Sequence, residues 1–406
     1  MATLGNKPPP FDLRHLTPEF FADPYPVYRQ LREAAPVCLM PDGSYFLTRH
    51  RDLDEVYRDT KTYSSDKKIE FLPKYGDTPL YEHHTTSLVF NDPPLHTRVR
   101  RLIAGALTPR AIADMEGGLI ALVDQLLDNL EDKREADLIE FFASAIPVEI
   151  IGNLLGVPRE ERGPLREWSL AILIGLEPTL TPVQEARGNA AVTEFLTYLD
   201  DLVARRRAQP GDPSRDVLTR LIQGEADGEK LTSKELLHNC IFLLNAGHET
   251  TTNLIGNGLE LLARYRQQRQ RLLAEPHLIM SAVEEILRFE SSNQIGNRMT
   301  ALPAELSGVK MPAGTRITLC IAAANRDPEQ FADPEVFDIA RTPNRHLAFG
   351  AGPHVCVGLS LARLEGRIAL GRFVKRFPDY EILPGAVRGQ RARFRGFQTL
   401  PARVRT

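Results

Sequence analysis

Residues 349–365 read FGAGPHVCVGLSLARLE, a glycine-rich loop that holds one cysteine and continues directly into an apolar, helix-forming stretch. The chain has four cysteines, and their wide dispersal without a CxxC pair argues against a disulfide framework or a cysteine-rich zinc site. Cys240 and Cys320 lie inside apolar runs and are predicted to be small buried residues. The loop does not fit a dinucleotide-binding GxGxxG motif, because position 355 is valine. Cys356 is therefore the candidate functional thiol.

The composition is typical of a soluble globular protein. The chain has 406 residues, of which 42% are hydrophobic and 25% charged, with a net charge of −3 that gives no reason to expect nucleic acid as the main partner. The start, MATLGNKPPPFDLRHL, lacks the apolar core of a signal peptide, and no uninterrupted apolar run reaches the ~18 residues that a membrane span needs. We expect a cytoplasmic protein without a membrane segment.

The hydrophobic periodicity predicts a mainly α protein with small β elements. A β-hairpin is predicted over 35–50, with its turn at 41–43, and a second over 306–322, with its turn at 312–314. There is no repeat, linker or regular βαβ alternation, so residues 1–406 are expected to form one domain. Apolar residues recur at helical spacing in 97–106, 113–131, 138–155, 188–207, 214–222, 233–265, 267–274, 278–289 and 358–376.

The segment 233–265 is long enough for a helix of roughly 48 Å. Its centre reads FLLNAGHETTTNLIGNG, in which glycine, threonine and asparagine interrupt an otherwise apolar pattern. Such interruptions inside a core helix indicate a kink or a functional site.

Three motifs, in this order along the chain, resemble those of the cytochrome P450 family. They are (A/G)GxxT, ExxR and FxxGxxxCxG, and they correspond to Ala246–Thr250, to Glu285 with Arg288, and to Phe349, Gly352, Cys356 and Gly358. An ExxR pair alone is common on helix surfaces, whereas the cysteine loop is highly specific. The resemblance implies a mainly α fold with small sheets, in which haem b lies between the long central helix and the cysteine loop.

The resemblance makes Cys356 the proximal thiolate ligand of the haem iron, which favours O–O cleavage by donating electron density. Phe349 would shield the sulfur, and Gly358 would let the backbone come close to the porphyrin.

On the other side of the haem, the resemblance assigns oxygen activation to the central helix. Thr250 would hold the distal oxygen for protonation and Glu249 would relay protons from solvent, while Ala246 leaves room for oxygen and substrate. The alternative for Thr250 is a hydroxyl that only bonds the carbonyl four residues earlier. His248 lies at a position that varies in the family and is given no role.

Basic residues are expected to hold the haem propionates, and the resemblance assigns His96, Arg100, Arg298 and His354 to this task. Arg98 and Arg101 are expected to face solvent, where they would suit the docking of an acidic electron donor.

Glu285 and Arg288 are expected to be structural. In the family they join a third residue before the cysteine loop, for which Arg341 is the first choice and Arg345 the competing one. His83 and His84 are expected in a surface loop, with a metal site as the alternative.

The expected substrate pocket is mostly apolar, lined by Leu88, Val89, Leu173, Leu244, Ile295 and Phe397. Ser292 and Asn293 stand where many relatives carry proline and apolar residues, so they either hydrogen-bond an oxygenated substrate or face away from the pocket.

These expectations together describe a monooxygenase that inserts one oxygen atom from O2 into a medium-sized organic substrate, by hydroxylation or O-dealkylation. Because the haem domain accounts for the whole chain, electrons are expected from a separate ferredoxin-type donor and its NAD(P)H-dependent reductase. A peroxide-dependent hydroxylase and a non-catalytic haem sensor or carrier are the alternatives. The intact Glu249–Thr250 pair argues against both.

Overall fold

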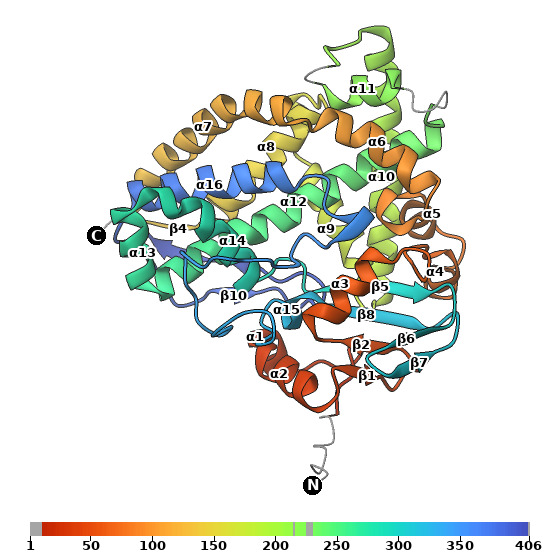
Figure 1. The fold of residues 1–406 in the computed structure, drawn as a ribbon. Coiled ribbons are helices and arrows are strands. Elements are labelled where there is room, and N and C mark those ends of the chain that lie inside the picture. Colours follow the sequence, from red (N-terminus) through yellow and green to blue (C-terminus); the bar gives the residue numbers. More distant parts are fainter. Residues whose placement is uncertain (1–9, 214–215, 225–229, 405–406) are drawn as a thin grey trace. The chain divides into compact units, whose positions relative to one another are not determined.

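The computed structural model describes residues 10–213, 216–224 and 230–404, which form two compact units (Figure 1). The first unit comprises Met1–Ser65, Gly256–Cys356 and Tyr380–Pro401, and the second comprises Asp66–Ile255, Val357–Asp379 and Ala402–Thr406. The chain therefore passes from one unit to the other at several points along its length.

The elements of the first unit are small sheets with short helices. Its helices are α1 (Pro18–Ala22), α2 (Tyr25–Ala34), α3 (His50–Arg58), α13 (Arg266–Ala274), α14 (Ile279–Phe289) and α15 (Ile321–Ala324), with 3₁₀ turns η4 (Pro276–Leu278) and η5 (Gly352–His354). Its strands are β1 (Val37–Leu39), β2 (Tyr45–Leu47), β3 (Tyr63–Ser64), β5 (Ile295–Thr300), β6 (Ala304–Leu306), β7 (Val309–Met311), β8 (Arg316–Cys320), β9 (Glu381–Ile382), β10 (Val387–Arg388) and β11 (Phe397–Thr399).

The second unit is almost entirely helical. Its elements are α4 (Lys68–Tyr75), α5 (Pro79–Thr86), η1 (Leu88–Phe90), α6 (Leu95–Ala106), α7 (Pro109–Glu131), β4 (Glu135–Asp137), the π turn η2 (Ile139–Ala143), α8 (Ala145–Leu154), η3 (Arg159–Glu161), α9 (Leu165–Ile174), α10 (Pro182–Ala208), α11 (Val217–Gln223) and α16 (Leu359–Arg376). Two elements, α12 (Ser233–Arg264) and β12 (Pro401–Arg403), contain residues of both units.

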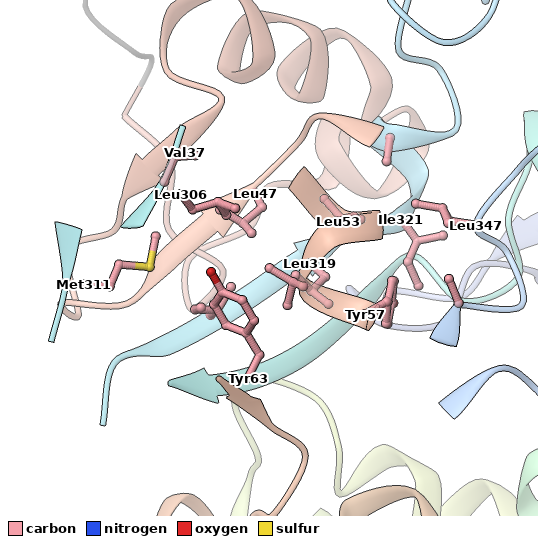
Figure 2. Close-up of a cluster of buried hydrophobic side chains, with 14 residues drawn as sticks. Val37, Leu47, Leu53, Tyr57, Tyr63, Leu306, Met311, Leu319, Ile321 and Leu347 are labelled. Carbon is pink, nitrogen blue, oxygen red and sulfur yellow. The ribbon is translucent and has the colours of Figure 1, made fainter. Parts of the chain in front are cut away.

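A five-stranded sheet in the order β1-β2-β8-β5-β3 organises the first unit. The expected hairpin of β1 and β2 is present, and β2 pairs with β8 in parallel while β5 runs antiparallel to β8. Figure 2 shows the apolar cluster at this sheet, where Leu53 and Tyr57 of α3 meet Leu319 of β8. Burial of such side chains stabilises the fold by about 1.5–3 kcal/mol each, so α3 is firmly fixed on the sheet.

The second predicted hairpin is wrong in its pairing. The turn at 312–314 exists, but β7 pairs with β6 and not with β8. Ser307 and Gly308 both have positive φ, 48° and 81°, which is the geometry of a two-residue hairpin turn. This tight turn closes β6 on β7, so β8 is left to pair with β2 and β5.

Helix starts in the second unit follow from local sequence. Thr181 and Gln184 form a reciprocal capping box at the start of α10, and Thr108 caps α7. The long helices α7 and α16 pack together, as Figure 1 shows, and the Phe142 and Phe373 rings lie 5.2 Å apart in the core of this unit.

The predicted helices are present, with ends shifted by a few residues, although residues 214 and 215 of the stretch 214–222 lie outside the described residues. The helix α12 continues unbroken through its polar centre, so the interruption marks no break. The described part of the chain contains no helix with both the length and the apolar content of a membrane span.

Candidate active site

The cysteine loop is shaped by two glycines with positive φ, Gly350 at 67° and Gly352 at 65°. A Cβ on Gly352 would lie 2.4 Å from the Tyr57 carbonyl oxygen, so only glycine lets the loop approach α3 this closely. The Cys356 backbone N–H donates to the Phe349 carbonyl at 2.9 Å, which closes the loop beneath the thiol. Gly358 follows as the N-terminal flanking residue of α16.

Cys356 is the only cysteine in the described residues that is not buried, since Cys38, Cys240 and Cys320 are all enclosed. Burial raises the pKa of the Cys240 and Cys320 thiols to about 12, which makes them poor metal ligands. A partly exposed cysteine on a glycine loop fits the axial thiolate ligand of a haem iron. His354 lies in the 3₁₀ turn just before this cysteine.

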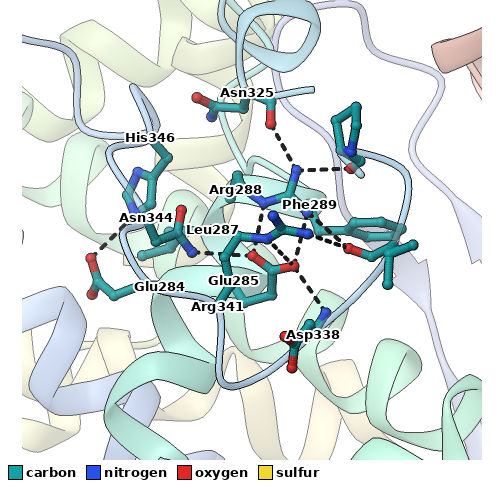
Figure 3. A network of polar contacts seen from close by, with 12 residues as sticks. Glu284, Glu285, Leu287, Arg288, Phe289, Asn325, Asp338, Arg341, Asn344 and His346 are labelled. Atoms are coloured by element: carbon teal, nitrogen blue, oxygen red, sulfur yellow. Dashed lines mark hydrogen bonds and ion pairs between the residues drawn. The ribbon is translucent and has the colours of Figure 1, made fainter. Parts of the chain in front are cut away.

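A buried charge network joins α14 to the segment that leads into the cysteine loop (Figure 3). The Arg288 guanidinium donates to both Glu285 carboxylate oxygens at 2.8 Å, and neither side chain is exposed to solvent. Arg341 donates to Glu285 at 3.2 Å, and the exposed Arg345 is not part of the network. Asn344 also donates to Glu285, at 3.1 Å, and no sequence motif pointed to it.

Arg288 also holds the chain beyond α15, because its guanidinium donates to the carbonyls of Asn325, Pro334 and Val336. The Asn325 side chain in turn accepts from the Leu347 backbone N–H at 2.7 Å. The network thus fixes the backbone on the approach to Phe349.

The centre of α12 shows two kinds of environment. Ala246 is exposed and Thr250 partly exposed, whereas Glu249 is buried. The Thr250 hydroxyl donates to the Ala246 carbonyl at 2.7 Å. This is the hydrogen bond expected if Thr250 has no catalytic role. This bond uses the single hydroxyl proton but leaves the oxygen lone pairs able to accept. A Cβ on Gly247 would lie 2.3 Å from Ile151, so this position is closed to larger residues.

The expected propionate partners come from both units. In the second unit His96 is buried and Arg100 partly buried, both on α6. In the first unit Arg298 on β5 is buried, and its guanidinium lies 5.2 Å from the centre of the Tyr57 ring. Tyr57 therefore contacts both Arg298 and the cysteine loop, a role to which no sequence motif pointed.

Two expectations about surface residues are wrong. Arg98 was expected to face solvent, but its side chain is largely buried and forms an ion pair with Glu235, 137 residues away. Arg101 is exposed, as expected. His83 and His84 lie buried in α5 and not in a surface loop. No group of residues suited to hold a metal ion occurs within the described ranges, which leaves the alternative for these histidines without support.

The residues expected to line the substrate pocket are also distributed over both units. In the second unit Leu88, Leu173 and Leu244 are buried and Val89 is partly buried. In the first unit Ile295 and Phe397 are buried.

Ser292 and Asn293 belong to a strand-like segment of the first unit that pairs with residues 393–395. Arg395 N–H donates to the Ser292 carbonyl at 2.8 Å, and Asn293 forms a bridge with Phe394. The Ser292 hydroxyl is buried and has no hydrogen-bond partner among the described residues. The contacts of this hydroxyl therefore do not explain why the chain has serine where many family members have an apolar residue.

The chain is mainly helical, and the one cysteine of its described residues that is not buried lies on a glycine loop. A buried Glu–Arg network holds the segment that leads into this loop. These are features of a haem-thiolate protein. A model of the family described as Cytochrome P450 matches residues 172–385. Cytochrome P450 107B1 of Saccharopolyspora erythraea is 40% identical, with 99% of each chain covered. The vitamin D(3) 25-hydroxylase of Pseudonocardia autotrophica is 38% identical over 90% of this chain and 89% of its own.

A solved structure agrees: P450BioI in complex with an acyl carrier protein ligated to hexadec-9Z-enoic acid matches with a TM-score of 0.89 at 33% identity, over 95% of this chain and 99% of the other. The chain belongs to the cytochrome P450 family. It is a haem-thiolate monooxygenase that hydroxylates organic substrates.

Proposed function

We propose that this monooxygenase acts on a long, mainly apolar substrate of the lipid or polyketide type, and that the whole chain works as one catalytic domain. The printed ligand or activity of two relatives supports this class: P450BioI holds a hexadecenoyl chain on a carrier protein, and another relative hydroxylates vitamin D3. The buried leucines Leu88, Leu173 and Leu244 suit such a molecule. Ser292 is then the candidate to bind a polar end of the substrate.

The Ala246–Thr250 turn carries the assignment of the site. In this turn Ala246 is exposed, Gly247 and Thr250 are partly exposed, and Asn245, His248 and Glu249 are buried. This hydroxyl, already donating to the Ala246 carbonyl, can only accept from a proton donor such as water. Thr250 would therefore hold a proton carrier in place, and the adjacent Glu249 carboxyl would supply the proton.

The bound haem would supply the site where dioxygen binds and its O–O bond breaks. Cys356 would hold the iron, with Phe349 and Gly358 completing the loop around the sulfur. The cationic side chains of Arg100 and Arg298, together with His96 and His354, would bind the two propionates. Glu285, Arg288 and Arg341 would fix the loop without taking part in the reaction.

Electrons would come from a separate ferredoxin-type donor and its NAD(P)H-dependent reductase, in the cytoplasm. Arg101, exposed on α6, is the basic candidate for docking an acidic donor. Arg101→Glu should weaken donor binding at low salt and have little effect at high salt. Equal donor affinity for both proteins at low salt would remove Arg101 from the docking surface.

The experiment that tests the substrate class is a difference-absorption titration of the ferric enzyme. The probes are hexadec-9Z-enoic acid, testosterone and vitamin D3, with 4-methoxybenzoic acid as a compact aromatic control. We expect a low-spin to high-spin change with at least one long apolar probe and none with the control. A change with the aromatic acid alone would overturn the proposed class.

A further inference from the structure

The buried side of α12 next to the oxygen-activating turn carries polar groups without protein partners. Asn245 and His248 are 3% and 1% exposed, and their spacing of three residues places them on one face of the helix. Neither amide atom of Asn245 and neither ring nitrogen of His248 has a hydrogen-bond partner among the described residues.

A third group of the same kind lies on α9. Ser169 is completely buried, and its hydroxyl also has no partner in the described part of the chain. Arg166, one turn earlier on the same face of α9, is close enough to His248 for its charge to act on the imidazole. Ser169 therefore lies on the same face of α9 as the residue whose charge acts on His248.

Unpaired polar groups of this kind are costly, at about 1–3 kcal/mol each when buried. Native proteins satisfy them with ordered water, each molecule making about three hydrogen bonds. The five atoms, one from Ser169 and two each from Asn245 and His248, are enough to hold on the order of two waters. We therefore expect the cluster formed by these three side chains to hold water in the folded protein.

The imidazole of His248 has the properties that a water chain requires. Burial, assisted by the charge of Arg166, lowers the pKa of His248 to about 4, so the ring is neutral at pH 7. A neutral imidazole has one N–H donor and one acceptor nitrogen, and can therefore link two waters in sequence.

The α12 members of this cluster lie beside the proposed proton donor in the helix. Glu249 follows His248 directly and lies one turn after Asn245, and its own carboxyl is buried. A buried carboxyl that gives up a proton must be reprotonated for the next turnover, and direct solvent contact is restricted.

We propose that Ser169, Asn245 and His248 hold a chain of buried waters that carries protons from the α9 side to Glu249. Each water accepts one proton and releases one, so the chain transfers a proton without changing its own composition or charge. His248 is a positioning residue in this path and does not touch the reacting atoms. The inference rests on the proposed role of Glu249.

The first test is a high-resolution crystal structure of the holoenzyme. We expect ordered waters within hydrogen-bond distance of the Asn245 amide and the His248 ring, and a further link to Glu249. A dry cluster, or one closed by direct side-chain bonds, would overturn the proposal whatever the activity of the enzyme.

The second test compares three variants in NADPH-driven turnover of whichever titration probe gives the largest spin-state change. His248→Phe should lower the share of electrons recovered in product about tenfold and raise the solvent isotope effect. His248→Gln, which can still donate and accept, should recover most of the coupling. His238→Phe is the matched control, a buried histidine ten residues earlier on the same helix.

Glu249→Gln separates the two levels of the proposal. If Glu249→Gln lowers coupling while His248→Phe does not, the water chain is wrong and the proton donor stands. If neither changes coupling, the role of Glu249 fails as well. Should His248→Phe fail to fold, as judged by the reduced carbon monoxide spectrum, Asn245→Leu provides the same test from the other anchor.

Discussion

Thr250 illustrates how a single hydrogen bond limits what a catalytic residue can do. Its hydroxyl proton is used by the Ala246 carbonyl, so the oxygen is left as an acceptor. Any role in oxygen activation must then consist of holding a group that carries a proton.

Thr250→Ala should preserve haem binding and substrate affinity but divert electrons from product to hydrogen peroxide. The physical reason is that the acceptor which orients the proton carrier is removed, while the small side chain leaves the helix intact. The measurement is product formed per NADPH oxidised. Thr252→Ala is the matched control, because its hydroxyl makes the same bond to a carbonyl four residues earlier. Unchanged coupling in Thr250→Ala would contradict the assignment.

Glu365, buried in α16, predicts a pH dependence of stability. Burial raises the pKa of its carboxyl from 4.5 to about 8, against a smaller opposing effect of the Thr251 hydroxyl. The folded protein therefore binds the proton more tightly than the unfolded chain. This contribution is greatest below pH 4.5 and is lost as the pH rises toward 8 and beyond.

The corresponding variant is Glu365→Gln, which mimics the protonated acid at every pH. Between pH 5 and 9, the free energy of unfolding of the unmodified enzyme should fall by roughly 3–5 kcal/mol more than that of Glu365→Gln. Urea unfolding at a series of pH values measures this, with the exposed Glu140→Gln as the control. Parallel pH profiles for the enzyme and Glu365→Gln would refute the buried-acid interpretation.

Sequence patterns predicted the helices, whose formation depends on residues close together in the chain. They missed the contacts between residues that are far apart in the chain. The long helices followed from periodicity within each segment. The burial of His83 was missed because the partner ring, His238 on α12, lies 155 residues away and 5.7 Å distant. Similarly, the ion pair of Arg98 with Glu235 cannot be read from α6 alone.

The second hairpin failed for a local reason. Two turn sequences compete within 306–322, and the pair at Ser307 and Gly308 closes a hairpin while Pro312–Gly314 only redirects the chain. In the candidate site, the motifs singled out Cys356, Glu285 and Arg288 as candidates. Asn344 and Tyr57 carry no motif, and their contacts, with Glu285 and with Gly352 respectively, arise only in the folded chain.

The histidines between α5 and α12 should make this contact sensitive to acid. Burial, together with His84 and His238, holds the pKa of His83 well below 6.5. Burial also lowers the pKa of His238 to about 4, with Glu82 opposing and Lys234 adding to the decrease. Because these pKa values are depressed in the folded state, their stability contribution is complete above pH 6.5 and is lost as the pH falls toward 4.

We therefore expect the amides of α5 to lose protection from hydrogen exchange between pH 7 and pH 5, after correction for intrinsic rates. His238→Phe should reduce this loss, because one of the titrating groups is removed. Peptides of α7, which lacks histidine, serve as the internal control. Equal protection of α5 at both pH values would show that the cluster tolerates charge.

The Glu285–Arg288 network should be indispensable for the cysteine loop. Arg288→Ala removes a buried cation and three carbonyl contacts, and leaves the Glu285 carboxylate poorly compensated. The expected loss of stability is about 3–5 kcal/mol, with little haem incorporated. Arg345→Ala, on the exposed neighbour, should leave both urea unfolding and the reduced carbon monoxide spectrum unchanged. A stable, haem-loaded Arg288→Ala would contradict the structural role.

At the scale of the whole molecule, the chain crosses between the two compact units at 65/66, 255/256, 356/357, 379/380 and 401/402. Neither unit is a continuous segment, so either unit can fold alone only by closing long unfolded loops, which costs conformational entropy. We expect a single cooperative unfolding transition of the holoenzyme. Far-ultraviolet circular dichroism and haem absorbance should give coincident curves in urea. Two separated transitions would show that the units fold independently.

The same crossings bear on how this enzyme could be recombined with its relatives. Residues 66–255 form one uninterrupted block within the second unit, bounded by crossings on either side. Exchanging this block as a whole keeps the packing inside it. The exchanged block contains all of the helical candidate residues, Leu88, Leu173, Leu244, Glu249 and Thr250. Cys356 lies outside the block and stays with the loop of the host. Chimeras joined at 65/66 and 255/256 would thus combine the helical candidate residues of one parent with the thiolate loop of another.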